Sequence, residues 1–115
     1  MHLSKDSYLW GRCALFATAL KNITGWHIYA ISEKHSDQYS HFFVINPSNN
    51  KAYDAAGIRS FEDIAEYYEI SEYYLDKIEH KFSGNFTEEE LNLATDDVYE
   101  VFPDLKNKIS ILTKE

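Results

Sequence analysis

The sequence is poor in several residue types, and each shortage excludes a class of protein. Only one of its 115 residues is a cysteine, so no internal disulfide can form, which is typical of proteins in a reducing cytoplasm. The four glycines are widely scattered and form no phosphate-binding loop, so a nucleotide-dependent mechanism has no support. Apolar runs are far shorter than the roughly 20 residues of a membrane-spanning helix, and the first residues lack the pattern of a secretion signal. We therefore expect a cytoplasmic protein that does not enter a membrane.

Basic residues are also scarce. The chain has 11 basic and 19 acidic residues, a net charge of -8, which argues against direct binding to nucleic acid or to an anionic membrane. The imbalance lies in the second half, because residues 1–59 carry a net charge of +2 and residues 60–115 a net charge of -10. This acidic half is either a solvated helical surface or a face that docks on a basic partner.

Hydrophobic and aromatic residues, by contrast, are plentiful. They make up 44% and 16% of the chain, which is enough apolar surface for a folded core and excludes a disordered chain. The length suits one domain, and no repeat, low-complexity tract or linker divides it. We expect residues 1–115 to fold as a single domain.

The first half of the chain predicts a helix followed by strands. An apolar, alanine-rich segment from Arg12 to about Asn22 indicates a buried helix, and Thr24-Gly25 ends it. Aromatic and β-branched residues then predict strands over residues 26–31, 39–45 and 51–55, with a polar loop over residues 32–38. The turn-forming residues 46–50 join the last two strands into a β-hairpin.

The second half predicts mainly helices. Ser60 is a plausible helix N-cap, and Thr87 begins a capping box with Glu90. Asp96-Asp97 predicts the start of another short helix, which Pro103 ends or interrupts. The tyrosines at positions 67, 68, 73 and 74 are expected to be packing residues.

Cys13 stands where the first predicted helix begins. The positive end of a helix dipole stabilises a thiolate, and the thiolate is the nucleophilic form of cysteine. Gly11 would let the backbone approach the sulfur closely, and the amides of the first helical turn would be free to hold an oxyanion. The alternative is simple core packing, because cysteine is among the most frequently buried residue types.

His41 and Asp54 are polar residues in strongly apolar strands. An unpaired imidazole or carboxylate there costs on the order of a few kcal/mol, so each requires a partner. A hairpin loop with an even number of residues places both on one face of the sheet. A loop of Pro47-Ser48 or of residues 46–49 predicts directly opposite positions, with Cβ atoms about 5 Å apart, and a loop of Ser48-Asn49 predicts diagonal neighbours. Taken singly, His41 could be an ordinary hydrogen-bonded histidine and Asp54 a turn or capping residue.

The remaining candidate sites are weaker. The five histidines have no H-x-x-x-H spacing and the chain has no cysteine pair, so we expect no metal and no other cofactor. His27 is expected in the core or at the edge of a strand, and His35 at the surface of a polar loop. Glu88-Glu89-Glu90 suits the first turn of a helix rather than a catalytic carboxylate pair.

Three motifs together resemble the papain-like cysteine peptidase superfamily, particularly its small bacterial, phage and transglutaminase-like branches. They are Gly11-Arg12-Cys13-Ala14-Leu15-Phe16-Ala17-Thr18-Ala19-Leu20, Ser40-His41-Phe42-Phe43-Val44 and Tyr53-Asp54-Ala55-Ala56-Gly57, and the resemblance covers about residues 7–60. It implies an α+β, papain-like fold in which a central N-terminal helix packs on a small antiparallel sheet and the C-terminal half is helical. It also implies that Cys13 is the nucleophile, His41 the general base and acid, and Asp54 the residue that orients His41.

The chain departs from that superfamily at two places. Papain-type peptidases usually carry a glutamine several residues before the cysteine, where this chain has Asp6-Ser7-Tyr8, and transglutaminase-like enzymes usually have an H-x-W pattern, where this chain has Phe43. The preferred function is amide hydrolysis or acyl transfer on a narrow protein substrate, as by a peptidase, a deamidase or a transglutaminase. The rival is a non-catalytic acidic binding or inhibitor protein, phage-encoded in one version, that docks on a basic host surface through its acidic helical half.

Overall fold

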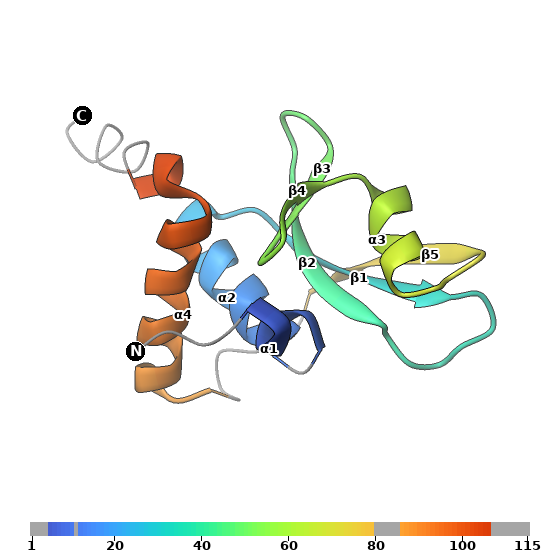
Figure 1. Ribbon diagram of the computed structural model, residues 1–115, viewed down its shortest axis with the longest axis horizontal. Coiled ribbons are helices and arrows are strands. Elements are labelled where there is room, and N and C mark those ends of the chain that lie inside the picture. Colours follow the sequence, from blue (N-terminus) through green and yellow to red (C-terminus); the bar gives the residue numbers. More distant parts are fainter. Residues whose placement is uncertain (1–4, 11, 80–85, 107–115) are drawn as a thin grey trace.

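The computed structural model describes residues 5–10, 12–79 and 86–106 (Figure 1). In chain order, the helices and strands are α1 (Lys5–Trp10), α2 (Cys13–Thr24), β1 (Ile28–Glu33), β2 (His41–Asn46), β3 (Lys51–Asp54), β4 (Gly57–Arg59), α3 (Phe61–Tyr67), β5 (Tyr73–Ile78) and α4 (Glu88–Val101). This order confirms the α+β class. No helix of the described ranges has the length and apolar character needed to cross a bilayer.

All five strands belong to one antiparallel sheet in the order β4-β3-β2-β1-β5. From β1 to β4 each strand pairs with the next, and β5 returns to pair with β1 at the opposite edge. The predicted hairpin is therefore the β2–β3 pair at the centre of the sheet. An N-terminal helix packed on an antiparallel sheet is confirmed, with α2 lying against β2.

Helices cover both faces of the sheet (Figure 1). α2 lies on one face, and α4 packs on the outer side of α2. The larger core lies between these layers and includes Leu15, Phe16, Leu20, Ile28, Val44, Ala94 and Val98. On the opposite face, Ile64 and Ala65 of α3 belong to a second core with Phe43. Because successive strand residues point to opposite faces, neighbouring residues of β2 contribute to different cores.

The boundaries of α2 are close to those expected from the sequence. Gly25 ends the helix in the left-handed conformation, with φ of 78°, and its N–H donates to the Lys21 carbonyl at 2.7 Å. At the other end Arg12 is the N-cap residue, and its side chain makes no capping hydrogen bond. Cys13 is consequently the first helical residue, in the turn whose backbone N–H groups have no partner within the helix.

The second half is less helical than its sequence predicts. The segment Tyr73–Ile78 is the edge strand β5, paired with β1 along its whole length. Tyrosine and isoleucine favour a strand here, and β1 supplies the pairing partner. Of the four tyrosines expected to be packing residues, Tyr68 and Tyr73 are partly buried, but Tyr67 and Tyr74 are 42% and 53% exposed. The short strand β4 was not expected either.

Asp96 and Asp97 lie inside α4 rather than at the start of a helix. The capping box at Thr87 and Glu90 is present, and the helix that it begins continues unbroken to Val101. Asp97 is 5% exposed and accepts a hydrogen bond from the Tyr8 hydroxyl of α1. Asp97 therefore marks a tertiary contact between two helices, which a local capping pattern does not predict.

Candidate active site

The hairpin between β2 and β3 brings His41 and Asp54 to the same face of the sheet. Val44 pairs with Tyr53, which leaves a four-residue turn over residues 47–50. Continuing this register makes His41 and Asp54 diagonal neighbours, as the Ser48-Asn49 alternative predicts. The directly opposite arrangement is wrong.

Asparagine side chains stabilise this turn and hence the register. Oδ1 of Asn46 accepts a hydrogen bond from the Ser48 N–H at 2.9 Å, and Oδ1 of Asn49 accepts one from the Lys51 N–H at 3.0 Å. Asn50 has a φ of 57°, in the left-handed region that asparagine tolerates better than most residues. A shift of one residue would move either Asp54 or His41 to the other face.

His41 and Asp54 form a buried pair. The Nε2 atom of His41 lies 2.8 Å from Oδ2 of Asp54, and the two residues are 1% and 2% exposed. Burial by itself lowers the pKa of His41, but the hydrogen bonds and charges of Asp54 and Cys13 outweigh it, so that the pKa is raised overall. Burial by itself raises the pKa of Asp54. The hydrogen bonds and charges of His41 and Arg59 lower it by more, so the pKa of the carboxyl group lies below its usual range. The pair is therefore built to carry opposite charges.

Arg59 of β4 supports the carboxylate from the other side. Its Nη2 atom donates to Oδ2 of Asp54 at 2.5 Å, and its guanidinium lies 5.5 Å from the centre of the Tyr67 ring. The Ala56 N–H donates to the second oxygen, Oδ1, at 2.9 Å. Both sequence-based interpretations of Asp54 therefore hold, because it accepts a hydrogen bond within the turn and also binds His41.

Cys13 reaches this pair from the N-terminus of α2. It lies beside His41 and close to the backbone at Phe42 and Ala14. Burial by itself raises the pKa of the Cys13 thiol, but the interactions with His41 and with these backbone groups outweigh burial, so the pKa lies below its usual range. The residue is only partly buried. The structure therefore brings together all three residues singled out in the sequence, Cys13, His41 and Asp54.

A tyrosine that the sequence suggested only for packing completes the cluster. The hydroxyl oxygen of Tyr68 lies 3.0 Å from Nδ1 of His41 and 2.5 Å from the carbonyl oxygen of Leu9. Its ring lies over the imidazole, with the ring centres 4.9 Å apart. Burial raises the pKa of Tyr68, and the nearby charges of Cys13 and Asp54 raise it further. The hydroxyl is therefore neutral at physiological pH.

Sequence reasoning missed both Arg59 and Tyr68. Arg59 could have been found from a second hairpin. Ala55-Ala56-Gly57 follows β3 and allows the chain to turn back, which places Arg59 on a strand next to β3. Tyr68 had no such signal. Its position depends on the end of α3, which the chain brings back to the sheet.

Two further histidines of the described residues, His27 and His35, are exposed and outside the cluster. His27, expected in the core or at a strand edge, is exposed just before β1, and His35 is exposed in the loop after β1, as expected. Within residues 5–10, 12–79 and 86–106, no group of three or more histidine, cysteine or carboxylate residues is arranged to hold a metal ion.

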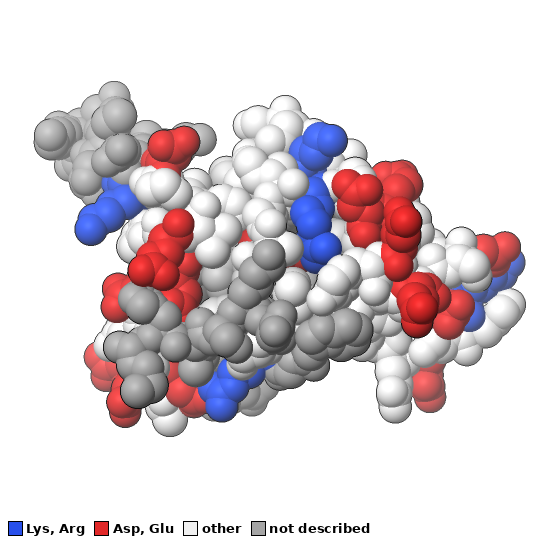
Figure 2. All heavy atoms as spheres, viewed as in Figure 1, with Lys and Arg blue, Asp and Glu red and all other residues white. Residues whose placement is uncertain are grey.

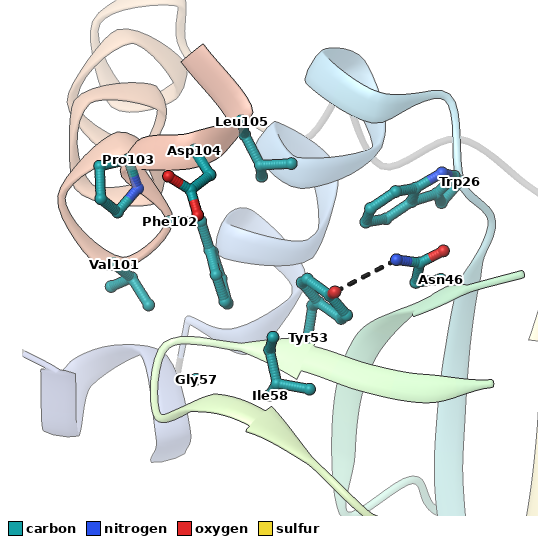
Figure 3. A pocket seen from close by; sticks show the side chains of 10 residues that line it. All are labelled: Trp26, Asn46, Tyr53, Gly57, Ile58, Val101, Phe102, Pro103, Asp104 and Leu105. Carbon is teal, nitrogen blue, oxygen red and sulfur yellow. Dashed lines mark hydrogen bonds between the residues drawn. The ribbon is translucent and has the colours of Figure 1, made fainter. Parts of the chain in front are cut away.

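A cavity of about 490 Å³ lies elsewhere, between the end of α4 and the β3–β4 hairpin (Figure 3). Trp26, Tyr53 and Phe102 supply most of its aromatic lining, and Nδ2 of Asn46 donates to the Tyr53 hydroxyl at 3.1 Å. None of the three candidate catalytic residues lines it. The cavity is consequently separate from the candidate active site.

Acidic side chains gather in two groups on the face shown in Figure 2, one over α4 and one over α3. The first turns of both helices supply part of these groups, with Glu88, Glu89 and Glu90 on α4 and Glu62 and Asp63 on α3. Acidic residues in a first helical turn are favourable to the helix itself because they interact with its dipole. Part of the acidic charge of the second half therefore has a structural explanation.

Comparison with known proteins adds no relative. No protein-family model, curated protein or solved structure matches the chain. The papain-like resemblance therefore depends on the three sequence motifs, and the chemistry of the site depends on the His41–Asp54 hydrogen bond and on Cys13 beside it.

Proposed function

We propose that the chain is a cysteine-dependent enzyme of papain-like architecture that hydrolyses or transfers the acyl group of an amide in a protein substrate. One observation carries the proposal: His41 is hydrogen-bonded to Asp54 and lies beside the partly exposed Cys13 at the start of α2. A nucleophile, a base beside it and a third group that orients the base form the usual arrangement of covalent acyl transfer.

The first half of the reaction follows from the charges of the site. The Cys13 thiolate attacks the amide carbon, a C–S bond forms, and the carbonyl oxygen becomes an oxyanion. His41 then donates its proton to the amide nitrogen, the C–N bond breaks, and the amine leaves. Asp54 remains ionised and holds His41 through Nε2, so the proton that His41 exchanges is the one on Nδ1, which lies 3.0 Å from the Tyr68 hydroxyl oxygen.

The second half releases the acyl group. Neutral His41 takes a proton from water, or from an acceptor amine, whose oxygen or nitrogen attacks the thioester carbon. The C–S bond breaks, and Cys13 leaves as the thiolate beside the protonated His41. Water gives hydrolysis or deamidation and an amine gives transfer, so the same three groups serve each of these reactions.

Backbone N–H groups at the start of α2 are suited to hold the oxyanion. Arg12 makes no side-chain cap, and its carbonyl accepts from the N–H groups of Leu15 and Phe16, later in the turn. The N–H of Cys13 itself precedes these and lies beside the reacting sulfur. This N–H would stabilise the oxyanion, a task shared in papain-type peptidases by a glutamine before the cysteine, which this chain lacks.

The proposal is tested by the rate of Cys13 alkylation as a function of pH. Cys13 is the only cysteine, so mass spectrometry of the whole protein reports on it alone. An ordinary thiol of pKa about 8.5 is only about 0.3% ionised at pH 6. Even after allowing for the lower intrinsic nucleophilicity of a stabilised thiolate, Cys13 should react with iodoacetamide about tenfold faster than free cysteine at pH 6.

Matched variants assign the effect to the site. His41→Ala should remove the excess reactivity, whereas His27→Ala, which removes an exposed histidine outside the site, should retain it. Free-cysteine rates in the unaltered protein would contradict the proposal. Candidate substrate proteins incubated with the active protein or with Cys13→Ala then show, by mass spectrometry, whether cleavage, deamidation or crosslinking occurs.

A second function is favoured by the two acidic groups over α3 and α4 (Figure 2). In this case the chain is a non-catalytic binding protein that covers a basic surface on a host protein. Binding would then weaken steeply with salt and be unaffected by Cys13→Ala. An enzyme that docks its substrate through these helices would instead show salt-sensitive binding together with a reactive Cys13.

A further inference from the structure

The hydroxyl of Tyr68 has one proton, and the structure shows where that proton goes. Its oxygen lies within hydrogen-bond distance of both the Leu9 carbonyl and Nδ1 of His41. A carbonyl oxygen can only accept, so the Tyr68 O–H donates to Leu9. The tyrosine oxygen is then left to accept from His41, which requires a proton on Nδ1.

The hydrogen bond at the other ring nitrogen, Nε2, determines the charge of His41. Nε2 faces Oδ2 of Asp54, which also accepts from Arg59 and can only accept while it is ionised. Both ring nitrogens therefore donate, and a histidine with two N–H groups is the imidazolium cation.

We infer that Tyr68, with the Leu9 carbonyl behind it, is a positioning residue that selects the imidazolium form of His41 and thereby keeps Cys13 ionised. The inference deepens the proposed function and rests on it, because the role of Tyr68 is to hold the acid and base of that reaction. Tyr68 acts through His41 and needs no contact with the substrate.

The selection comes from what happens when His41 loses its Nδ1 proton. The lone pairs of Nδ1 and of the Tyr68 oxygen would then face each other at 3.0 Å. To remove this repulsion, the Tyr68 O–H would have to donate to Nδ1 of His41, and the Leu9 carbonyl would then lose its donor. Leu9 lies next to the end of α1, where helix carbonyls have no partner within the helix. The neutral form of His41 therefore always lacks one hydrogen bond.

The end of α3 fixes the position of Tyr68. The Ile70 N–H bonds to the Ala65 carbonyl at 2.8 Å and the Glu69 N–H to the Glu66 carbonyl at 3.1 Å, with Glu69 at a φ of 58°. This pair of bonds is the Schellman motif, in which the chain reverses directly after the helix. Tyr68 is the C-cap residue of that motif, so its direction is set by backbone geometry.

Few other charged groups face His41 in the described part of the chain. Cys13 approaches from α2, Asp54 from β3 and Tyr68 from the end of α3, with Arg59 of β4 bound to Asp54. The residue that β1 pairs with His41 is Ile31, which does not titrate. Any test of Tyr68 must therefore separate its effect on the protonation of His41 from the effects of Cys13 and Asp54.

Tyr68→Phe tests the inference because it keeps the ring over His41 and removes only the hydroxyl. The measurement is the pH dependence of Cys13 alkylation, with Tyr74→Phe, an exposed tyrosine on β5, as the matched control. Hydrogen bonds to charged groups are strong, but water can partly replace this one, so we expect a shift of about one pH unit. This shift lowers the pKa of His41, so the ratio of the thiolate–imidazolium pair to the neutral pair falls about tenfold and the alkylation rate near neutral pH should fall. Tyr74→Phe should leave the profile in place.

A second measurement separates Tyr68 from the thiolate. In Cys13→Ala protein, nitrogen NMR of His41 as a function of pH reports the charge of the ring without any sulfur beside it. The midpoint should be lower by about one pH unit when Tyr68→Phe is added. Equal midpoints, or a higher alkylation rate near neutral pH in Tyr68→Phe, would overturn the inference. If the unaltered protein alkylates like free cysteine while the NMR midpoints still differ, the positioning of His41 stands and the proposed function fails.

Discussion

Replacing Asp54 by asparagine should destabilise the protein and lower the reactivity of Cys13 at the same time. The two residues have the same shape, but the carboxylate accepts from three donors: the Nε2–H of His41, the Nη2–H of Arg59 and the N–H of Ala56. His41 and Arg59 bind one oxygen and Ala56 the other. An asparagine has a single oxygen, so in either orientation its NH₂ group faces at least one of these donors.

The size of the effect follows from burial. Asp54 is 2% exposed, so water does not replace what is lost. Hydrogen bonds to charged groups contribute about 1.5–3 kcal/mol each, and removing one partner from a buried ion pair costs about 3–5 kcal/mol. We expect Asp54→Asn to lower the free energy of unfolding by about 3 kcal/mol at pH 6, measured by denaturant titration with the slope checked for two-state behaviour.

The pH dependence of this difference has a defined sign. The pKa of Asp54 is lowered in the folded protein, so its contribution is full above the unfolded value of about 3.9 and is lost as the pH falls through the folded value. The pKa of His41 is raised, so its contribution is full below about 6.5 and is lost as the pH rises through the folded value. The difference between the two proteins should be largest between about pH 4 and 6.5.

Asp76→Asn is the matched control, because it makes the same chemical change at an exposed position of β5. It should change the free energy of unfolding by no more than about 0.5 kcal/mol. The reasoning is refuted if Asp54→Asn is as stable as this control at pH 6. It is also refuted if Asp54→Asn unfolds more easily but leaves the alkylation profile of Cys13 unchanged.

Three further substitutions test the surrounding structure. Arg59→Leu removes a cation that lowers the pKa of Asp54, so acid unfolding should begin at a higher pH, as circular dichroism across a pH series would show. Tyr8→Phe removes a donor to the buried Asp97 and should cost about 1–3 kcal/mol in denaturant titration, with unchanged Cys13 alkylation. Glu69→Gly relieves a left-handed backbone conformation and should raise the free energy of unfolding by about 0.5–1 kcal/mol; a loss of stability would contradict the assigned motif.

Local signals explain the parts of the site that the sequence predicts. The alanine-rich segment and Gly25 define α2 and place Cys13 in its first turn, and both features lie within one element. The asparagine-rich turn limits the hairpin to a few registers, one of which is observed. Choosing among those registers requires the hydrogen bonds of the turn, so composition alone leaves both the opposite and the diagonal arrangement open.

The parts that escape prediction depend on contacts between distant segments. β5 forms a strand by pairing with β1, a partner at least 40 residues earlier in the chain, and its short segment does not reveal that partner. The reversal after α3 carries Glu69 at the left-handed position where glycine is the usual signal. Without that signal the sequence gives Tyr68 no direction, and its place beside His41 follows only from the folded chain.

Stability does not account for the cluster around His41. Taking charged groups out of water is costly, and replacing a buried ion pair by apolar residues of similar volume is often neutral or stabilising by about 1–4 kcal/mol. A packing role would therefore be served as well by apolar side chains at positions 41 and 54. The arrangement instead places a buried ion pair beside Cys13, which is the partly exposed one of the three candidate catalytic residues. Buried charges beside a partly exposed thiol are what the proposed reaction with a substrate from solution requires.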